Sequence, residues 1–186
     1  MSTNSINQNQ SEENHADLAG GDAVQKIREL VEEAQTCFFC TAARIEGSTG
    51  VRPMSVQQVD DEGNLWFLSA SDSHKNLELE QNAAVDLYFQ GSAHSDFLHL
   101  KGVATVSDDR EKIGELWEPI IGSWFTGGVD DPRITVIQVV PSEGYYWDNK
   151  HGNAIAALKI VIGAVLHKTM DDSIEGRLDV AAVGED

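Results

Sequence analysis

The spacing of apolar residues divides this chain into one leading helix followed by a series of short strands. Residues 22–35, "DAVQKIRELVEEAQ", place apolar side chains three and four positions apart, which predicts an amphipathic helix with Asp22 as its N-cap. From Cys37 onward the period shortens to two, and polar turn residues separate the segments. The pattern predicts strands at residues 37–45, 51–59, 64–70, 84–90, 96–106, 134–140 and 144–148.

Helical patterns interrupt these strands at three places, residues 73–81, 108–117 and 151–167. The polar stretch "DDEGN" (residues 60–64) predicts a hairpin loop between the second and third strands. Pro53 cannot donate a ladder hydrogen bond, so we expect its strand to lie at an edge or to contain a bulge. Many short strands with few helices predict a mainly β domain with flanking helices, either a small barrel or a sandwich.

Composition narrows the class of protein. The chain has 186 residues and 41% hydrophobic content, so one domain with tails is expected. We assign residues 1–20 to a disordered N-terminal tail, 21–167 to the domain and 168–186 to an acidic C-terminal tail. The net charge of −18 argues against nucleic acid as a partner. The longest apolar run, residues 154–166, is too short to cross a membrane, and without a secretory pattern we expect a cytoplasmic protein.

Basic and hydroxyl residues gather around "RPMSVQQVDDEGNLWFLSASDSHKN", residues 52–76. Arg52 begins one strand, and the segment "SASDSHK" that ends in Lys75 follows the next. A helix beginning near Ser73 would add free N–H groups and the positive end of its dipole. Together these groups could hold a phosphate, which binds best to charged and neutral donors. A solvated turn with a helix N-cap explains the same residues equally well.

Several segments in order resemble one known family. They are "RPM", "LWFLSASDSHK", "VDLYF", "GVATVSDDREKIGELW", "WFTGGVDDP" and "YYWD". Over about residues 24–147 the chain resembles the FMN-binding split β-barrel proteins related to pyridoxamine 5′-phosphate oxidase, and more narrowly the general stress protein 26 branch. The resemblance implies a split β-barrel, FMN as cofactor, and a homodimer with the flavin in the cleft between subunits.

The resemblance also implies roles for individual residues. Arg52 and Lys75 would bind the FMN phosphate, and Trp147, with Trp124, would approach the flavin from the second subunit. The other implied cofactor-binding residues are Ser69, Ser73 and His74 near the phosphate, and Pro53, Met54, Ser55 and Leu68 along the ring.

Two departures from the oxidases bear on activity. Phe97 stands where they carry a glutamine that contacts the flavin, and "DNKHGNAIAALK" replaces their Arg-x-His-Asp-Arg type segment, which grips the substrate phosphate. FMN is therefore expected without the oxidation of pyridoxamine phosphate, and no catalytic residue is assigned. The chain is expected to be either an FMN-dependent oxidoreductase acting on a small molecule or electron donor, or a non-catalytic flavin-binding stress protein that acts as a sensor or FMN carrier. Haem or a deazaflavin could replace FMN in such a fold.

Other chemistry-bearing residues have simpler explanations. Cys37 and Cys40 lie three apart in a predicted strand, so they face opposite sides and should share neither a metal nor a disulfide. Asp130 and Asp131 could bind calcium but lack further ligand spacing, and a turn is favoured. We expect Trp117 to be a core residue. No metal site is predicted.

Overall fold

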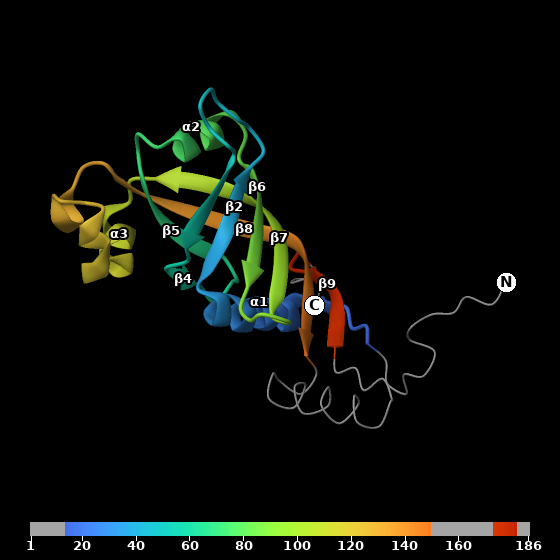
Figure 1. Ribbon diagram of the computed structural model, residues 1–186. Helices are drawn as coiled ribbons and strands as arrows, with labels where there is room; N and C mark the ends of the chain where they lie inside the picture. Colours follow the sequence, from blue (N-terminus) through green and yellow to red (C-terminus); the bar gives the residue numbers. More distant parts are fainter. Residues whose placement is uncertain (1–13, 150–172, 182–186) are drawn as a thin grey trace.

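The computed structural model describes residues 14–149 and 173–181 of the chain. Strands dominate, and the helices lie around them (Figure 1). The strands are β1 (Leu18–Ala19), β2 (Thr36–Thr41), β3 (Val51–Ser55), β4 (Gln58–Val59), β5 (Leu65–Ala70), β6 (Ala84–Gln90), β7 (Phe97–Ser107), β8 (Ile134–Asn149) and β9 (Ser173–Asp179). The α-helices are α1 (Gly20–Ala34), α2 (His74–Gln81) and α3 (Arg110–Leu116), and the 3₁₀ helices are η1 (Pro119–Ser123) and η2 (Gly128–Asp130).

The strands form one curled sheet in the order β1-β9-β8-β7-β6-β2-β3, and β5 adds to β8 and carries β4. The long strand β8 makes this arrangement possible. Its first half pairs with β5 and its second half with β9, while β7 follows it along nearly its whole length. A register shift lies between Lys101 and Gly102. An added Cβ at Gly102 would lie 2.5 Å from the Val140 carbonyl oxygen, so this close approach requires glycine.

The barrel is not closed. Within the described residues β3 pairs only with β2, and the chain reaches β5 through the short strand β4. This incomplete closure is the split-barrel architecture expected for the chain. Figure 1 shows α1 crossing one end of the barrel, α2 lying at the other end, and α3 standing to one side.

Successive side chains of β5 point to opposite faces of the strand, and each face packs in a different apolar core. Its residues Leu65 and Phe67 face the barrel interior, where Phe67 meets Phe39 edge to face at 5.4 Å between ring centroids. One face of α1 closes this core with Ala23, Ile27, Leu30 and Val31. The opposite face of β5 packs on a smaller core beneath α3, which contains Ile113 and Ile134. Each strand therefore contributes to the barrel core through every second residue.

The structure confirms most predicted elements and corrects four details. Helix α1 begins at Gly20, so Asp22 lies in the first turn and is not the N-cap. The predicted strand over residues 51–59 is split into β3 and β4, and the hairpin joins β4 to β5. The segment "RPMSV" therefore pairs with β2, and not with the third predicted strand as the expected hairpin implied. The two strands predicted over residues 134–148 form the single strand β8, because the chain continues through Pro141 without a turn.

The expectation of an acidic C-terminal tail over residues 168–186 is wrong for Ser173–Asp179. This segment is strand β9, which pairs antiparallel with β8 and parallel with β1, so the expectation of a disordered tail over residues 1–20 is wrong for Leu18–Ala19. Its apolar side chains are too few to predict a strand, but Leu178 is buried in the barrel core. The helix predicted over residues 151–167 lies outside the described residues. Among the described helices, none has the length and apolar character needed to span a membrane.

Candidate functional site

Helix α2 brings polar residues to one end of the barrel. Ser73 caps the helix, with its side chain accepting a hydrogen bond from the Asn76 backbone N–H. The face of α2 that packs against the barrel is polar for most of its length, because Lys75, Asn76 and Glu78 are buried beside Leu79. Buried polar side chains need partners. They find them in a polar cluster made of Thr41, Ser48, Arg52, Ser69, Ser73, Lys75, Asn76, Glu78 and Thr135.

One half of the polar cluster is an ion pair between β3 and α2. Arg52 Nη2 lies 2.6 Å from Glu78 Oε2, and the same oxygen accepts a hydrogen bond from Thr41 Oγ1 at 2.6 Å. Arg52 also donates to Thr41 Oγ1 and to Ser48 Oγ, both at 3.1 Å. Burial raises the pKa of Glu78, but hydrogen bonds from Ser48, Thr41 and Arg52 and the Arg52 charge outweigh it and lower the pKa to about 2. Glu78 is therefore ionised at neutral pH.

The other half contains a buried lysine. Lys75 is 7% exposed, and its Nζ donates to Ser69 Oγ and, at 3.5 Å, to Ser73 Oγ. Ser69 Oγ in turn donates to Asn76 Oδ1 at 2.7 Å, and Asn76 Nδ2 donates to Thr135 Oγ1 at 2.9 Å. Burial, and then the nearby charge of Arg52, lower the pKa of Lys75 to about 8, although Glu78 acts in the opposite direction. The ammonium thus has hydroxyl partners, but no described carboxylate lies within ion-pair distance.

These charges do not balance. Arg52 and Lys75 supply two positive charges at neutral pH, and Glu78 supplies one negative charge. Hydroxyl groups of Ser69 and Ser73 lie beside Lys75, at the N-terminal end of α2. An excess cation among neutral donors at a helix N-terminus fits a phosphate group, which needs both. The residues predicted to hold the FMN phosphate are therefore brought together here, apart from His74, which is exposed on the first turn.

The structure distributes the predicted ring-contacting residues over different surfaces. Met54 is half-buried and packs against the barrel core, whereas Pro53 and Ser55 are exposed on the other face of β3. Leu68 packs against the smaller core beneath α3, on the face of β5 opposite to Ser69. Within one copy of the chain, Met54 and Leu68 thus do not share a surface with Pro53.

The two predicted tryptophans are both available to a second molecule. Trp124 follows η1 and is 70% exposed. Trp147 is 42% exposed on β8, where Tyr145 lies at 4.7 Å between ring centroids. Trp117, by contrast, packs against the smaller core, as predicted. Neither Trp124 nor Trp147 belongs to the polar cluster.

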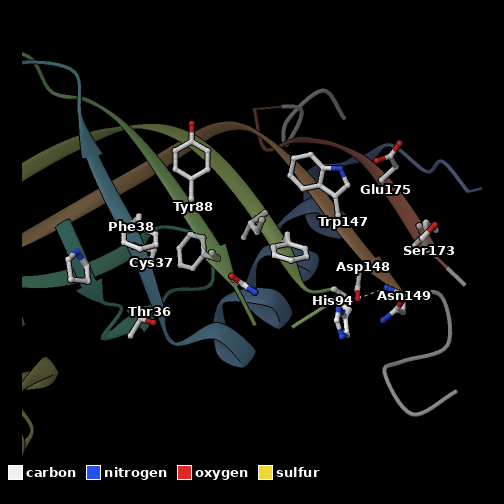
Figure 2. A pocket seen from close by; sticks show the side chains of 17 residues that line it. Thr36, Cys37, Phe38, Tyr88, His94, Trp147, Asp148, Asn149, Ser173 and Glu175 are labelled. Carbon is white, nitrogen blue, oxygen red and sulfur yellow. Dashed lines mark hydrogen bonds between the residues drawn. The ribbon is translucent and has the colours of Figure 1, made fainter. Parts of the chain in front are cut away.

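A groove of about 820 Å³ runs along the ends of β2, β6, β7, β8 and β9 (Figure 2). Phe38, Tyr88 and Trp147 come from three of these strands, and Pro53 of β3 also contributes. The remaining lining residues are Thr36, Cys37, Phe89, Gln90, His94, Ser95, Phe97, Leu98, Asp148, Asn149, Ser173, Ile174 and Glu175. Its described lining contains no Arg or Lys. The groove thus suits an aromatic or apolar group and not a phosphate.

The outer face of the same strands exposes several large apolar side chains beside polar ones. Phe38 is 58% exposed and pairs across the ladder with Tyr88, and Val103 is 55% exposed and pairs with Val140. Tyr88 stacks on His99 at 4.5 Å between ring centroids, and His99 Nε2 lies 2.7 Å from Asp86 Oδ1. A set of large apolar side chains exposed over several adjacent strands is typical of an interaction surface.

The remaining sequence candidates have structural roles. Cys37 and Cys40 are both free thiols on opposite faces of β2, as predicted, and burial raises the pKa of Cys37 to about 12. Asp131 is buried and forms an ion pair with Arg133, with 2.7 Å between Oδ2 and Nη2. The two residues are two positions apart, so this contact stabilises a local turn. No group of three potential metal ligands occurs among the described residues.

Sequence reasoning missed Glu78, Thr41 and Asn76. Helix α2 is polar at nearly every position, so its pattern does not reveal which side is buried. The available signal was the i, i+3 spacing of Lys75 and Glu78, which places a carboxylate on the same side of the helix as the predicted phosphate ligand. It also missed the apolar outer face, although "CFFC" places aromatic residues on both sides of β2.

Comparisons with known proteins agree with this fold. A sequence model of the family described as "Pyridoxamine 5′-phosphate oxidase like" matches residues 22–171. The chain is 25% identical over 134 residues to Protein bli-3 of Neurospora crassa, across 66% of this chain and 64% of that protein. It therefore spans less than two thirds of the length of this relative.

Solved structures with the same fold include a general stress protein 26 from Jannaschia sp. CCS1, with a TM-score of 0.67 and 22% identity over 86% of this chain and 99% of that one. Another is a general stress FMN/FAD binding protein from Xanthomonas citri, with a TM-score of 0.55 and 22% identity over 66% and 84% of the two chains. The family match covers most of the sequence. This chain belongs to the pyridoxamine 5′-phosphate oxidase-like family.

Proposed function

We propose that this chain is an FMN-binding protein of the general stress protein 26 type. The observation that carries the proposal is the polar cluster, in which the two cations Arg52 and Lys75 face a single carboxylate, Glu78, among buried hydroxyl groups. Family membership and the FMN/FAD-binding name of the Xanthomonas citri structure support a flavin as the molecule that carries the phosphate.

In this proposal different residues bind the phosphate and the ring of the cofactor. Arg52, Lys75, Ser69 and Ser73 hold the phosphate, with His74 at the rim. The exposed residues Pro53 and Ser55 border the ring along the free edge of β3. FMN, when bound, supplies hydride or electron exchange at its ring, and the protein supplies orientation and electrostatics.

A homodimer completes the site. Trp147 and Trp124 are exposed and lie outside the polar cluster, so a second copy is needed to bring either ring to the flavin. The apolar outer face, which includes Phe38, Val103 and Val140, offers the surface for this association. A cytoplasmic location is part of the proposal, and the free thiols Cys37 and Cys40 are consistent with a reducing compartment.

The proposal leaves two alternatives, which differ in whether the bound flavin is reduced and reoxidised in a catalytic cycle. An FMN-dependent oxidoreductase would accept electrons from a donor such as a reduced nicotinamide and pass them to a small molecule. A sensor or FMN carrier would bind without turnover. The sequence "DNKHGNAIAALK" in place of the oxidases' Arg-x-His-Asp-Arg type segment favours the second, because it removes the group that grips a substrate phosphate.

The test begins with the absorption spectrum of the purified protein and a titration with FMN followed by flavin fluorescence. A flavin spectrum, or saturable binding of one FMN per subunit, supports the proposal. A haem or deazaflavin spectrum, or no binding of FMN, contradicts it. Reduction of the bound flavin by NADH or NADPH and its reoxidation by an acceptor then separate the oxidoreductase from the carrier.

A further inference from the structure

Glu78 is an acidic side chain at a site that we expect to bind an anion. It is fully buried on α2, with 0% of its surface exposed. Its Oε2 contacts Arg52 from β3 and Thr41 from β2, each at 2.6 Å, so it joins three elements at this end of the barrel. Oε1 makes no hydrogen bond of good geometry with the described residues, although Ser48 lies near enough to help lower the pKa of this carboxyl.

The charges around Glu78 explain why a carboxylate is present. Arg52 and Lys75 are close enough for the Arg52 charge to lower the pKa of Lys75. Lys75 is buried and Arg52 is partly buried, so water screens the repulsion between the two cations only in part. A carboxylate beside Arg52 offsets that repulsion without requiring a ligand. A bound phosphate would also offset it, so Glu78 and the phosphate compete to neutralise the same pair of cations.

We propose that Glu78 is the resident counter-anion of the phosphate site: it stabilises the ligand-free cluster by neutralising Arg52, and it thereby lowers the affinity of the site for phosphate. This inference rests on the proposed function, since it assumes that Arg52 and Lys75 receive a phosphate group. Glu78 is thus a positioning and affinity-setting residue and not a cofactor ligand. It leaves one net positive charge, carried by Lys75, for the incoming anion.

The substitution Glu78→Gln removes the charge and keeps the side-chain shape. Without ligand, the variant should unfold at a lower temperature than the wild type, because the Arg52–Lys75 repulsion is no longer offset. Its stability should recover as inorganic phosphate is added. The phosphate concentration that gives half of the maximal stabilisation should be lower than in the wild type by about tenfold or more, because a buried unit charge near the ligand has been removed.

Glu80→Gln is the matched control. Glu80 is exposed on the same helix, so its substitution changes the net charge equally but leaves the polar cluster intact. Its melting temperature and phosphate response should equal those of the wild type. The double variant Glu78→Gln/Lys75→Met removes one charge of each sign. It should fold even if Glu78→Gln alone does not, because only Arg52 then remains to be accommodated.

The outcomes separate this inference from the proposed function. If the wild type is stabilised by phosphate or FMN and Glu78→Gln responds no more strongly, the role assigned to Glu78 is wrong and the phosphate site stands. If Glu78→Gln fails to fold and the double variant does not recover, the role is equally wrong. If neither phosphate nor FMN stabilises any variant, the phosphate site itself is refuted, and the inference fails with it.

Discussion

Replacing Lys75 with methionine should stabilise the ligand-free protein while weakening FMN binding. Methionine keeps most of the aliphatic length of the side chain but carries no charge. Lys75 is 7% exposed, and burial and Arg52 lower its pKa from 10.5 to about 8. The folded state therefore penalises the ammonium, and the substitution removes that penalty.

The magnitude follows from the pKa shift. Each pKa unit corresponds to about 1.4 kcal/mol, so the penalty is roughly 3.5 kcal/mol while Lys75 is charged in both states. The charged hydrogen bonds from Nζ to Ser69 and Ser73 are lost in the variant, which costs about 1.5–3 kcal/mol. Ser69 keeps its hydrogen bond to Asn76. The net expectation is a gain of roughly 0.5–2 kcal/mol in the free energy of unfolding at pH 7.

The pH dependence gives this prediction a second signature. Between pH 8 and 10.5 the unfolded chain binds more protons at Lys75 than the folded chain does, so the stability of the wild type rises with pH through this window. The advantage of Lys75→Met should be full below pH 8 and shrink towards pH 10.5.

Urea denaturation in phosphate-free buffer, repeated across this pH range, measures both effects. Lys101→Met, a substitution of a lysine half-exposed on β7, is the control. The hydrogen bond to Glu143 raises the pKa of Lys101, so this variant should show no advantage that shrinks between pH 8 and 10.5. A Lys75→Met protein that is less stable than the wild type at pH 7, with a pH-independent difference, would show that the folded state does not penalise the Lys75 ammonium.

Two further predictions concern the second subunit. Trp147→Ala should increase the fluorescence of bound FMN, because an aromatic ring that contacts the flavin quenches it; unchanged fluorescence at saturation would mean that Trp147 does not contact the flavin. Val103→Asp on the outer face should shift the protein from dimer to monomer in sedimentation or light scattering, since Val103 is 55% exposed and pairs with exposed Val140. The control Leu77→Asp, on the exposed side of α2, should leave the association state unchanged, and a Val103→Asp protein that elutes as the wild type does would rule out this face as the interface.

The period of the apolar residues was enough to predict most of the fold. Alternation located β2 and β5–β8, and the helical spacing located α1 and α3, because each element buries one face in a core. Pro53 correctly predicted an edge strand. Strand β9 could not be predicted in the same way, because its burial comes from pairing with β8 and few of its side chains are apolar.

The candidate site was predictable only in part. The local clustering of Arg52 with Ser69, Ser73 and Lys75 was visible because these residues lie within 24 positions of one another. The carboxylate of Glu78 was hidden, because α2 shows no amphipathic pattern and only tertiary packing decides which polar residues it buries. Met54 and Leu68 were assigned to one surface on resemblance, whereas the pleat of β5 turns Leu68 towards α3.

In the proposed complex the phosphate group supplies most of the free energy of FMN binding through its contacts with the polar cluster. The most direct test is the ratio of the dissociation constants of riboflavin and FMN, measured for the wild type and for Lys75→Met by flavin fluorescence. We expect FMN to bind the wild type much more tightly than riboflavin does. Lys75→Met removes a charged hydrogen bond worth about 1.5–3 kcal/mol, so it should reduce that ratio by roughly 10–100-fold. Riboflavin binding should be unchanged. Equal affinities for FMN and riboflavin in the wild type would contradict the account.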